Sequence, residues 1–168
     1  MSPVRHFQKL LSVARTAWAC VILLAGVLVA TAHADAPQSL EGFARSTLEI
    51  RTAGGRHWLN IYLAQTDAQQ EQGLMFVRAL PADEGMLFPL PTPRIMTMWM
   101  KNTLIPLDML FIDARGRIVC VRAKAVPQSL DFISCDKPVK GVLEIGGGQA
   151  AARGIVVGDT VVHATFSR

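Results

Sequence analysis

The chain has 168 residues, and 17 lysines and arginines against 13 aspartates and glutamates give it a formal net charge of +4. Three of the basic residues and none of the acidic ones precede residue 35, so residues 35–168 carry 14 basic and 13 acidic residues, a net charge of +1. So small an excess gives no electrostatic support to a nucleic-acid partner, because phosphate backbones are bound by strongly basic surfaces.

The first 34 residues have the three parts of a secretory signal peptide. A basic start is followed by an apolar stretch at 17–30 and by the sequence AHA at 32–34, which fits the small-x-small cleavage rule. The apolar stretch is short for a membrane span, although an uncleaved signal acting as an anchor is an alternative. We expect cleavage after Ala34, a periplasmic or extracellular protein, and no membrane span in the mature chain.

The mature chain, residues 35–168, would have 134 residues, which is enough for one domain with a sizeable core. Residues 35–45 are polar and predict a loose N-terminal segment. A single domain is expected over residues 46–168.

Most of the domain has the alternating pattern of short strands. The turn sequences AGGR (53–56) and ARGR (114–117) each join two such segments and predict two hairpins. The segment PTPR (91–94) predicts a break between strands. The predicted strands span residues 46–52, 57–65, 86–90, 95–101, 107–113, 118–125, 141–146 and 159–166.

Two short helices are expected between the strands. The first would begin at Thr66-Asp67, with Gln70 or Glu71 reaching back to cap it, and would end at Gly73. The second lies within residues 147–154. Seven or eight short strands joined mostly by turns, without βαβ spacing, predict a mainly antiparallel β-sandwich or barrel with two short helices, a β-rich α+β fold.

Cys120 and Cys135 are the two cysteines of the mature chain. Export to an oxidising compartment would allow a disulfide between them. Two separate thiols are the alternative, because sequence alone does not place the two Cα atoms within bonding distance.

The segment 95–113 (IMTMWMKNTLIPLDMLFID) combines an apolar run with charged and amide side chains. Period-two alternation puts its methionines on one face of a strand, as the better core face, and Trp99 with Lys101 on the other. Asn102 can form the following turn. Asp108 would then lie near enough to meet Lys101.

This arrangement supports two interpretations. One is a partly buried Lys101–Asp108 pair that fixes the register of two strands. The other is a shallow ligand site, because a few polar groups that converge on an apolar surface are typical of such sites. The candidate ligand-binding residues are Trp99, Lys101, Asn102 and Asp108, with Met75 and Glu144 as walls.

Two further functions are open alternatives. Met96, Met98 and Met100 could offer thioethers to Cu(I), although methionines on one strand face more often pack in a core. A carboxylate-dependent hydrolase would need two carboxylates facing one cleft. Glu144 is a charge within a short apolar strand and needs a partner, for which Lys101 is a candidate.

Five motifs, which together cover about residues 46–166, resemble the DUF192 family of small, often exported bacterial and archaeal domains. The resemblance implies a compact, mainly β domain outside the cytoplasm, and it supplies no reaction, cofactor or catalytic residue. Val77 departs from the pattern, since an arginine is common there. The motifs are EQGLMF (71–76), DEGMLFPL (83–90), MWMKNTLIPLDMLFID (98–113), VLEI-GG (142–147) and RGIVVGD (153–159).

Together these observations predict an exported, monomeric, non-catalytic binding module without a cofactor. Its ligand is expected to be small and polar or anionic, with a carbohydrate as one candidate, because a tryptophan platform beside a lysine and an amide suits such molecules.

Overall fold

The computed structural model describes residues 39–166, and the expected signal peptide lies outside this range. The described residues form nine strands, two short α-helices and one 3₁₀-helix. The strands are β1 (Ala44–Thr52), β2 (Gly55–Leu63), β3 (Glu84–Arg94), β4 (Thr97–Met98), β5 (Leu107–Ile112), β6 (Ile118–Ala125), β7 (Ile133–Ser134), β8 (Val139–Gly146) and β9 (Thr160–Val162). The helices are α1 (Asp67–Gln72), α2 (Gln149–Ala152) and η1 (Ala164–Phe166).

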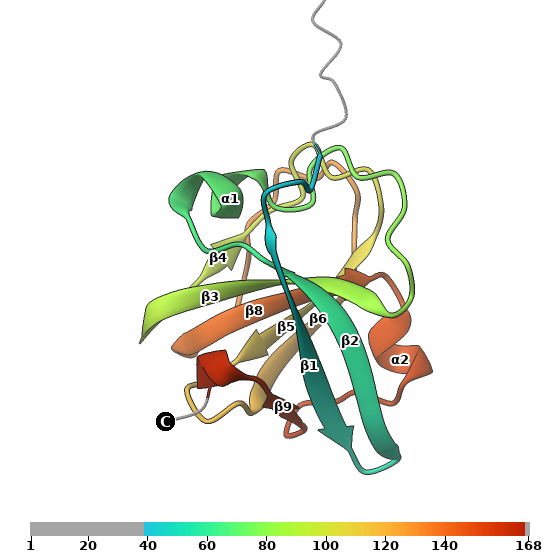
Figure 1. The fold of residues 1–168 in the computed structure, drawn as a ribbon, viewed down its shortest axis with the longest axis vertical. Helices are drawn as coiled ribbons and strands as arrows, with labels where there is room; N and C mark the ends of the chain where they lie inside the picture. Colours follow the sequence, from blue (N-terminus) through green and yellow to red (C-terminus); the bar gives the residue numbers. More distant parts are fainter. Residues whose placement is uncertain (1–38, 167–168) are drawn as a thin grey trace, which may run out of the picture. The chain divides into compact units, whose positions relative to one another are not determined.

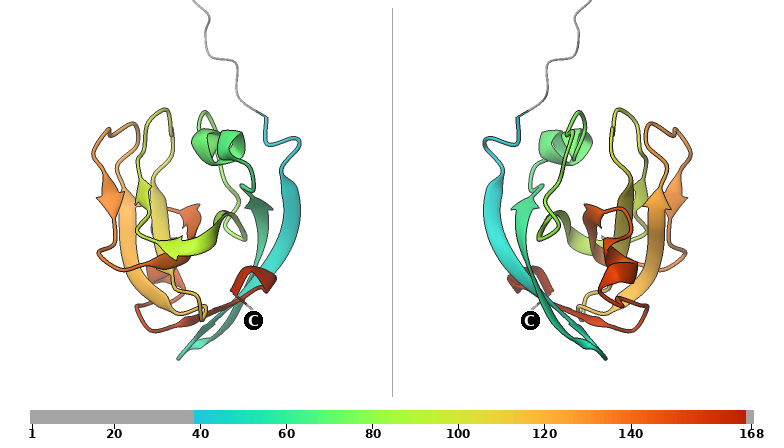
Figure 2. Two further views of the ribbon diagram at one scale, coloured as in Figure 1. Left: turned by 90° about the vertical axis from the view of Figure 1, so that its left-hand side faces the viewer. Right: turned by 90° about the vertical axis from the view of Figure 1, so that its right-hand side faces the viewer.

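Seven strands form one sheet in the order β6-β5-β8-β3-β2-β1-β9 (Figure 1). A second sheet has two strands, in which β4 pairs with β7. Only the β2–β3 pair of the larger sheet is parallel. The larger sheet curls strongly, so that its two ends turn toward each other (Figure 2). The expected β-rich fold is confirmed, and it takes the form of a half-barrel.

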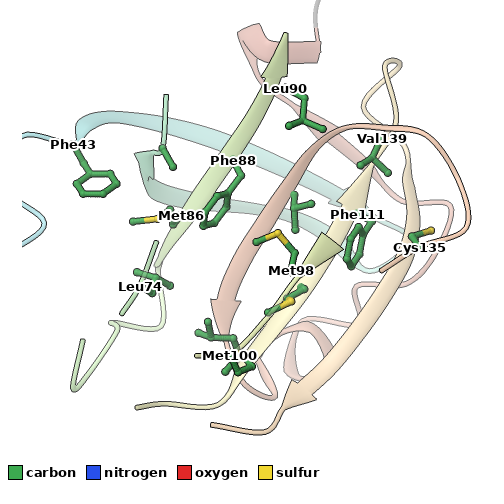
Figure 3. Packing of buried hydrophobic residues seen from close by; sticks show 14 residues of the cluster. Phe43, Leu74, Met86, Phe88, Leu90, Met98, Met100, Phe111, Cys135 and Val139 are labelled. Carbon is green, nitrogen blue, oxygen red and sulfur yellow. The ribbon is translucent and has the colours of Figure 1, made fainter. Parts of the chain in front are cut away.

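Alternate side chains of the central strands enter two apolar clusters, one on each face of the sheet. The first cluster contains Met86, Met109 and Val142 and extends to Met98 and Met100, as Figure 3 shows in part. The second cluster joins the opposite faces of β3, β5 and β8 to β1 and β2. The central strands are therefore buried on both faces.

The local features that start and stop α1 explain its position. Thr66 accepts a hydrogen bond from the Gln69 backbone, and the Gln69 side chain accepts one from the Thr66 backbone, which completes a capping box. The capping glutamine is thus Gln69, rather than the expected Gln70 or Glu71. Gly73 adopts a positive φ of 49° and ends the helix, as predicted.

Several predicted boundaries are wrong. β3 runs through the expected break at residues 91–94. The two prolines of that segment lie where the register between β3 and β8 is interrupted, so their missing N–H groups remove no hydrogen bond between the two strands. The strand expected at 95–101 is only β4, because β7 offers it just two partner residues. The last expected strand, 159–166, stops at β9 and continues as η1.

The segment predicted to be loose, residues 35–45, is ordered at its C-terminal end. Phe43 is buried in the first apolar cluster, and Ala44 begins β1. The prediction relied on the polar composition of the segment and gave too little weight to Phe43. Burial of this apolar ring anchors the stretch to the core.

Cys120 and Cys135 form a disulfide, with Cα atoms 6.1 Å apart. Cys120 lies in β6, and Cys135 directly follows β7, which pairs with β4. The bond therefore ties the two-stranded sheet to the edge of the larger sheet. Within residues 39–166, no helix is long and apolar enough to cross a membrane.

Candidate functional site

The segment around Trp99 has the alternating burial that its sequence predicts. Met98 and Met100 are buried, whereas Lys101 is exposed and Trp99 keeps 39% of its surface accessible. The Lys101 Nζ lies 5.1 Å from the centroid of the Trp99 ring, a cation–π distance. An aromatic face and a cation are thus presented together to solvent.

Asn102 forms the turn that was predicted for it. Its φ of 55° is left-handed, a conformation that asparagine tolerates better than most residues. Its carbonyl accepts a hydrogen bond of 2.9 Å from the Phe76 backbone, and its Nδ2 lies 3.8 Å from the Met75 Sδ. The turn therefore joins the Trp99 segment to the chain that leaves α1.

Helix α1 is held against the sheet by a glutamine. The Gln70 Nε2 donates to the Ala64 carbonyl at 3.2 Å and to the Pro89 carbonyl at 3.0 Å. These two bonds connect α1 to the end of β2 and to β3. The next two residues of α1, Glu71 and Gln72, lie around the same hollow as Trp99.

A hollow opens between α1, the Trp99 segment and β8. Its outer part is a groove of about 360 Å³ that reaches Asn102. Its inner part is a cavity of about 20 Å³ that reaches Thr103 and Glu144. We call groove and cavity together the Trp99 site; five residues line both parts: Glu71, Gln72, Met75, Trp99 and Lys101.

Glu144 is the buried acid of the Trp99 site. It lies on β8 between Met86 of β3 and Met109 of β5, and only 4% of its surface is accessible. In the part of the chain that the structure describes, its carboxyl group has no hydrogen-bond or ion-pair partner. Burial among apolar neighbours raises the pKa of Glu144 to about 8, so the group is mostly protonated at neutral pH.

Asp108 does not line the Trp99 site, and the expected Lys101–Asp108 pair is wrong. The Asp108 carboxylate is fully buried and accepts three backbone hydrogen bonds, from Lys124 at 2.7 Å, Gly148 at 2.9 Å and Ala150 at 2.8 Å. Because Met109 faces the Glu144 side of the sheet, its neighbour Asp108 points to the opposite side. Its role is to join β6 and the start of α2 to β5.

The three methionines proposed as Cu(I) ligands lie in or against the first apolar cluster. Met98 and Met100 belong to the cluster, and Met96 packs against it (Figure 3 labels the first two). This position fits the packing alternative. Among residues 39–166, no group of three or more histidine, cysteine or acidic side chains is arranged to hold a metal ion.

Five of the six candidate ligand-binding residues therefore line one hollow: Met75, Trp99, Lys101, Asn102 and Glu144. Sequence reasoning missed the contribution of α1, above all Glu71 and Gln72. Both belong to the EQGLMF motif at 71–76, which was the available signal. The connection between the parallel strands β2 and β3 places α1 over the hollow. The alternation of apolar and polar residues in the sequence does not reveal this connection.

Two solved structures resemble this chain closely. A protein from Sinorhizobium meliloti 1021, designated a "putative transcription regulator", is 41% identical with a TM-score of 0.71, and the match covers 73% of this chain and 96% of that one. A protein of unknown function from Novosphingobium aromaticivorans DSM 12444 is 38% identical with a TM-score of 0.72, and the match covers 76% and 91%. Among curated proteins, none matches this chain.

The family comparison agrees with the motifs quoted above. The model of the DUF192 family, described as Uncharacterized ACR, COG1430, matches residues 48–163. The matched range runs from β1 to the residue after β9 and includes all residues of the Trp99 site. The chain therefore belongs to the DUF192 family.

Proposed function

We propose that this protein is an exported binding module and that the Trp99 site takes a small polar ligand, for which a carbohydrate is the leading candidate. The observation that carries the proposal is the convergence, in one hollow, of a partly exposed tryptophan, a lysine and the carboxyl group of Glu144, which has no partner among residues 39–166. Ligand sites combine an apolar surface with a few converging polar groups in this way.

The dimensions of the hollow suit a ligand of this class. The groove of about 360 Å³ has room for a molecule the size of a monosaccharide or an amino acid. The Trp99 ring can stack on an apolar ring face, while Lys101, Asn102 and Gln72 supply hydrogen-bonding groups at the rim.

Export is part of the same proposal. The N-terminal sequence has the parts of a signal peptide. The Cys120–Cys135 disulfide supports a location outside the reducing cytoplasm, because structural disulfides persist in oxidising compartments. The nearly even balance of charges in residues 35–168 gives no support for carrying a transcriptional role over from the Sinorhizobium protein.

Nuclear magnetic resonance can test the binding proposal through the tryptophan indole N–H signals. Glucose, glucosamine and glucuronate would be titrated in turn, with the Trp99 signal assigned from a Trp99→Phe variant. We expect at least one probe to shift the Trp99 signal and leave that of Trp58 unchanged, since Trp58 is exposed and lies outside the site. No shift at Trp99 from any of the three would refute a carbohydrate ligand, and equal shifts at both tryptophans would refute specific binding at the Trp99 site.

A carboxylate-dependent hydrolase is a second candidate, because Glu71 and Glu144 line the same cavity. Glycoside hydrolysis uses one protonated acid and one carboxylate on either side of the scissile bond, and Glu144 and Glu71 are residues of the right type for these roles. Release of nitrophenol from nitrophenyl glycosides, lost in both Glu71→Gln and Glu144→Gln, would establish this activity. If a nitrophenyl glycoside binds but releases no nitrophenol, the hydrolase is excluded and the non-catalytic binding module stands.

A further inference from the structure

We infer that the ligand of the Trp99 site carries a primary amine, which enters the inner cavity as an ammonium group and binds the carboxyl group of Glu144. The inference rests on the proposed binding function, and it concerns the part of the ligand that would occupy the inner cavity beside Glu144.

The size of the inner cavity restricts the group that can enter it. A volume of about 20 Å³ is enough for one water-sized group and little more. An ammonium or hydroxyl group has one heavy atom and fits. A carboxylate or phosphate group is bulkier, carries negative charge and offers Glu144 no donor, so an acidic group of the ligand belongs in the outer groove beside Lys101.

The chemistry of Glu144 favours the ammonium group over the hydroxyl group. Glu144 as a residue is nine-tenths buried. Its carboxyl oxygens keep a little accessible surface at the cavity and have no partner among residues 39–166. Burying an unpaired acid is costly, and an ammonium group offsets this cost with both its charge and its three donors. A hydroxyl group supplies one donor and no charge.

The other charged groups around the cavity are compatible with a bound ammonium group. On the neighbouring strands, the residues paired directly with Glu144 are Met86 and Met109, which carry no charge. Glu71 from α1 and Lys101 from the Trp99 segment line the cavity and the groove. Glu71 attracts a cation and so opposes the repulsion from Lys101. Lys101 forms no ion pair with Glu144 and lies over the Trp99 ring.

Binding would release one proton for each ligand. The free protein holds the proton on the Glu144 carboxyl group, and the ligand arrives as a charged ammonium. In the complex Glu144 is a carboxylate paired with that ammonium, and its former proton passes to the solvent. No other bond forms or breaks. An amino sugar and an amino acid can both supply the ammonium group, with the remainder of the molecule in the groove beside Lys101.

Isothermal titration calorimetry can test the inference with glucosamine, glucose and glycine. The titrations would be run near pH 6.5, where both the amines and Glu144 are protonated, in two buffers of different ionisation enthalpy. We expect glucosamine to bind at least about tenfold more tightly than glucose and to release close to one proton. Binding of glycine with the same proton release, without glucosamine binding, would also support the amine and would identify an amino acid as its source.

Two variants locate the effect. Glu144→Gln should weaken binding of the amine about tenfold or more and abolish proton release, because a neutral amide cannot become a carboxylate. Glu41→Gln removes an exposed carboxylate outside the site and should leave both unchanged. The proton count of the unaltered protein is informative even if the Glu144 variant does not fold.

Two outcomes would overturn the inference in distinguishable ways. If glucose binds as tightly as glucosamine and no proton is released, the amine is wrong while the proposed binding function stands. If none of the probes binds and none shifts the Trp99 signal, the proposed function and the inference fall together.

Discussion

Replacing Glu144 with glutamine should change the pH dependence of stability. Burial raises the pKa of this carboxyl group from 4.5 to about 8. Between these values the folded state holds a proton that the unfolded state has lost. The free energy of unfolding therefore decreases as the pH rises through this window, the reverse of the usual behaviour of an ion-paired acid. Glu144→Gln removes the titrating group and with it this decrease.

The size of the effect follows from the difference between the two pKa values. Each unit of difference corresponds to about 1.4 kcal/mol. From pH 4.5 to pH 7 the unfolded carboxyl group becomes fully ionised while the folded one stays mostly protonated, so the unaltered protein should lose about 3 kcal/mol relative to the variant. Contributions from all other titrating groups cancel in this comparison.

Urea denaturation at several pH values between about 4 and 8 would measure the difference, with the disulfide kept intact. Glu41→Gln is the matched control, because its carboxyl group is exposed and should give a curve parallel to that of the unaltered protein. Parallel curves for Glu144→Gln as well would show that Glu144 is ionised in the folded protein, and the account of a neutral buried acid would be refuted.

Three further predictions concern the scaffold. Asp108→Ala leaves three backbone N–H groups without their acceptor and should lower the free energy of unfolding by ~3 kcal/mol or more in urea denaturation; a loss below about 1 kcal/mol would contradict its role. Hydrogen bonds from Arg56, and then those from Arg51, lower the pKa of Glu49 to about 2. The free energy of unfolding should therefore decrease as the pH falls from 4.5 toward 2, and this part of the decrease should be absent from an acid titration of Glu49→Gln. Reduction of the Cys120–Cys135 bond, whose cysteines are 15 residues apart, should cost about 3 kcal/mol, and denaturation curves that coincide with and without reductant would exclude this.

Local features of the sequence predicted local features of the fold. Both hairpins, the ends of α1 and the turn at Asn102 were predicted, because each depends on residues within a few positions of one another. The alternation of residues 95–101 correctly separated the buried methionines from Trp99 and Lys101, although only two of these residues belong to a strand.

Long-range strand order accounts for most of what was missed. β8 lies between β3 and β5, and no turn signal in the sequence encodes that pairing. Glu144 was named as a wall of the site, but the strand order that places it there was not predicted. The six residues of β5 are all buried, because apolar clusters cover both faces of the sheet. Alternation in residue type was therefore absent there, and the side of the sheet to which Asp108 points could not be deduced.

A crystal structure of the protein soaked with glucosamine near pH 6.5 would test the central claim most directly. The account predicts the amine nitrogen within hydrogen-bonding distance of the Glu144 carboxylate and the sugar ring against Trp99, about 2.8 Å being the usual length of such a charged contact. A structure in which the Lys101 ammonium itself fills the cavity and pairs with Glu144, with no sugar bound, would contradict it.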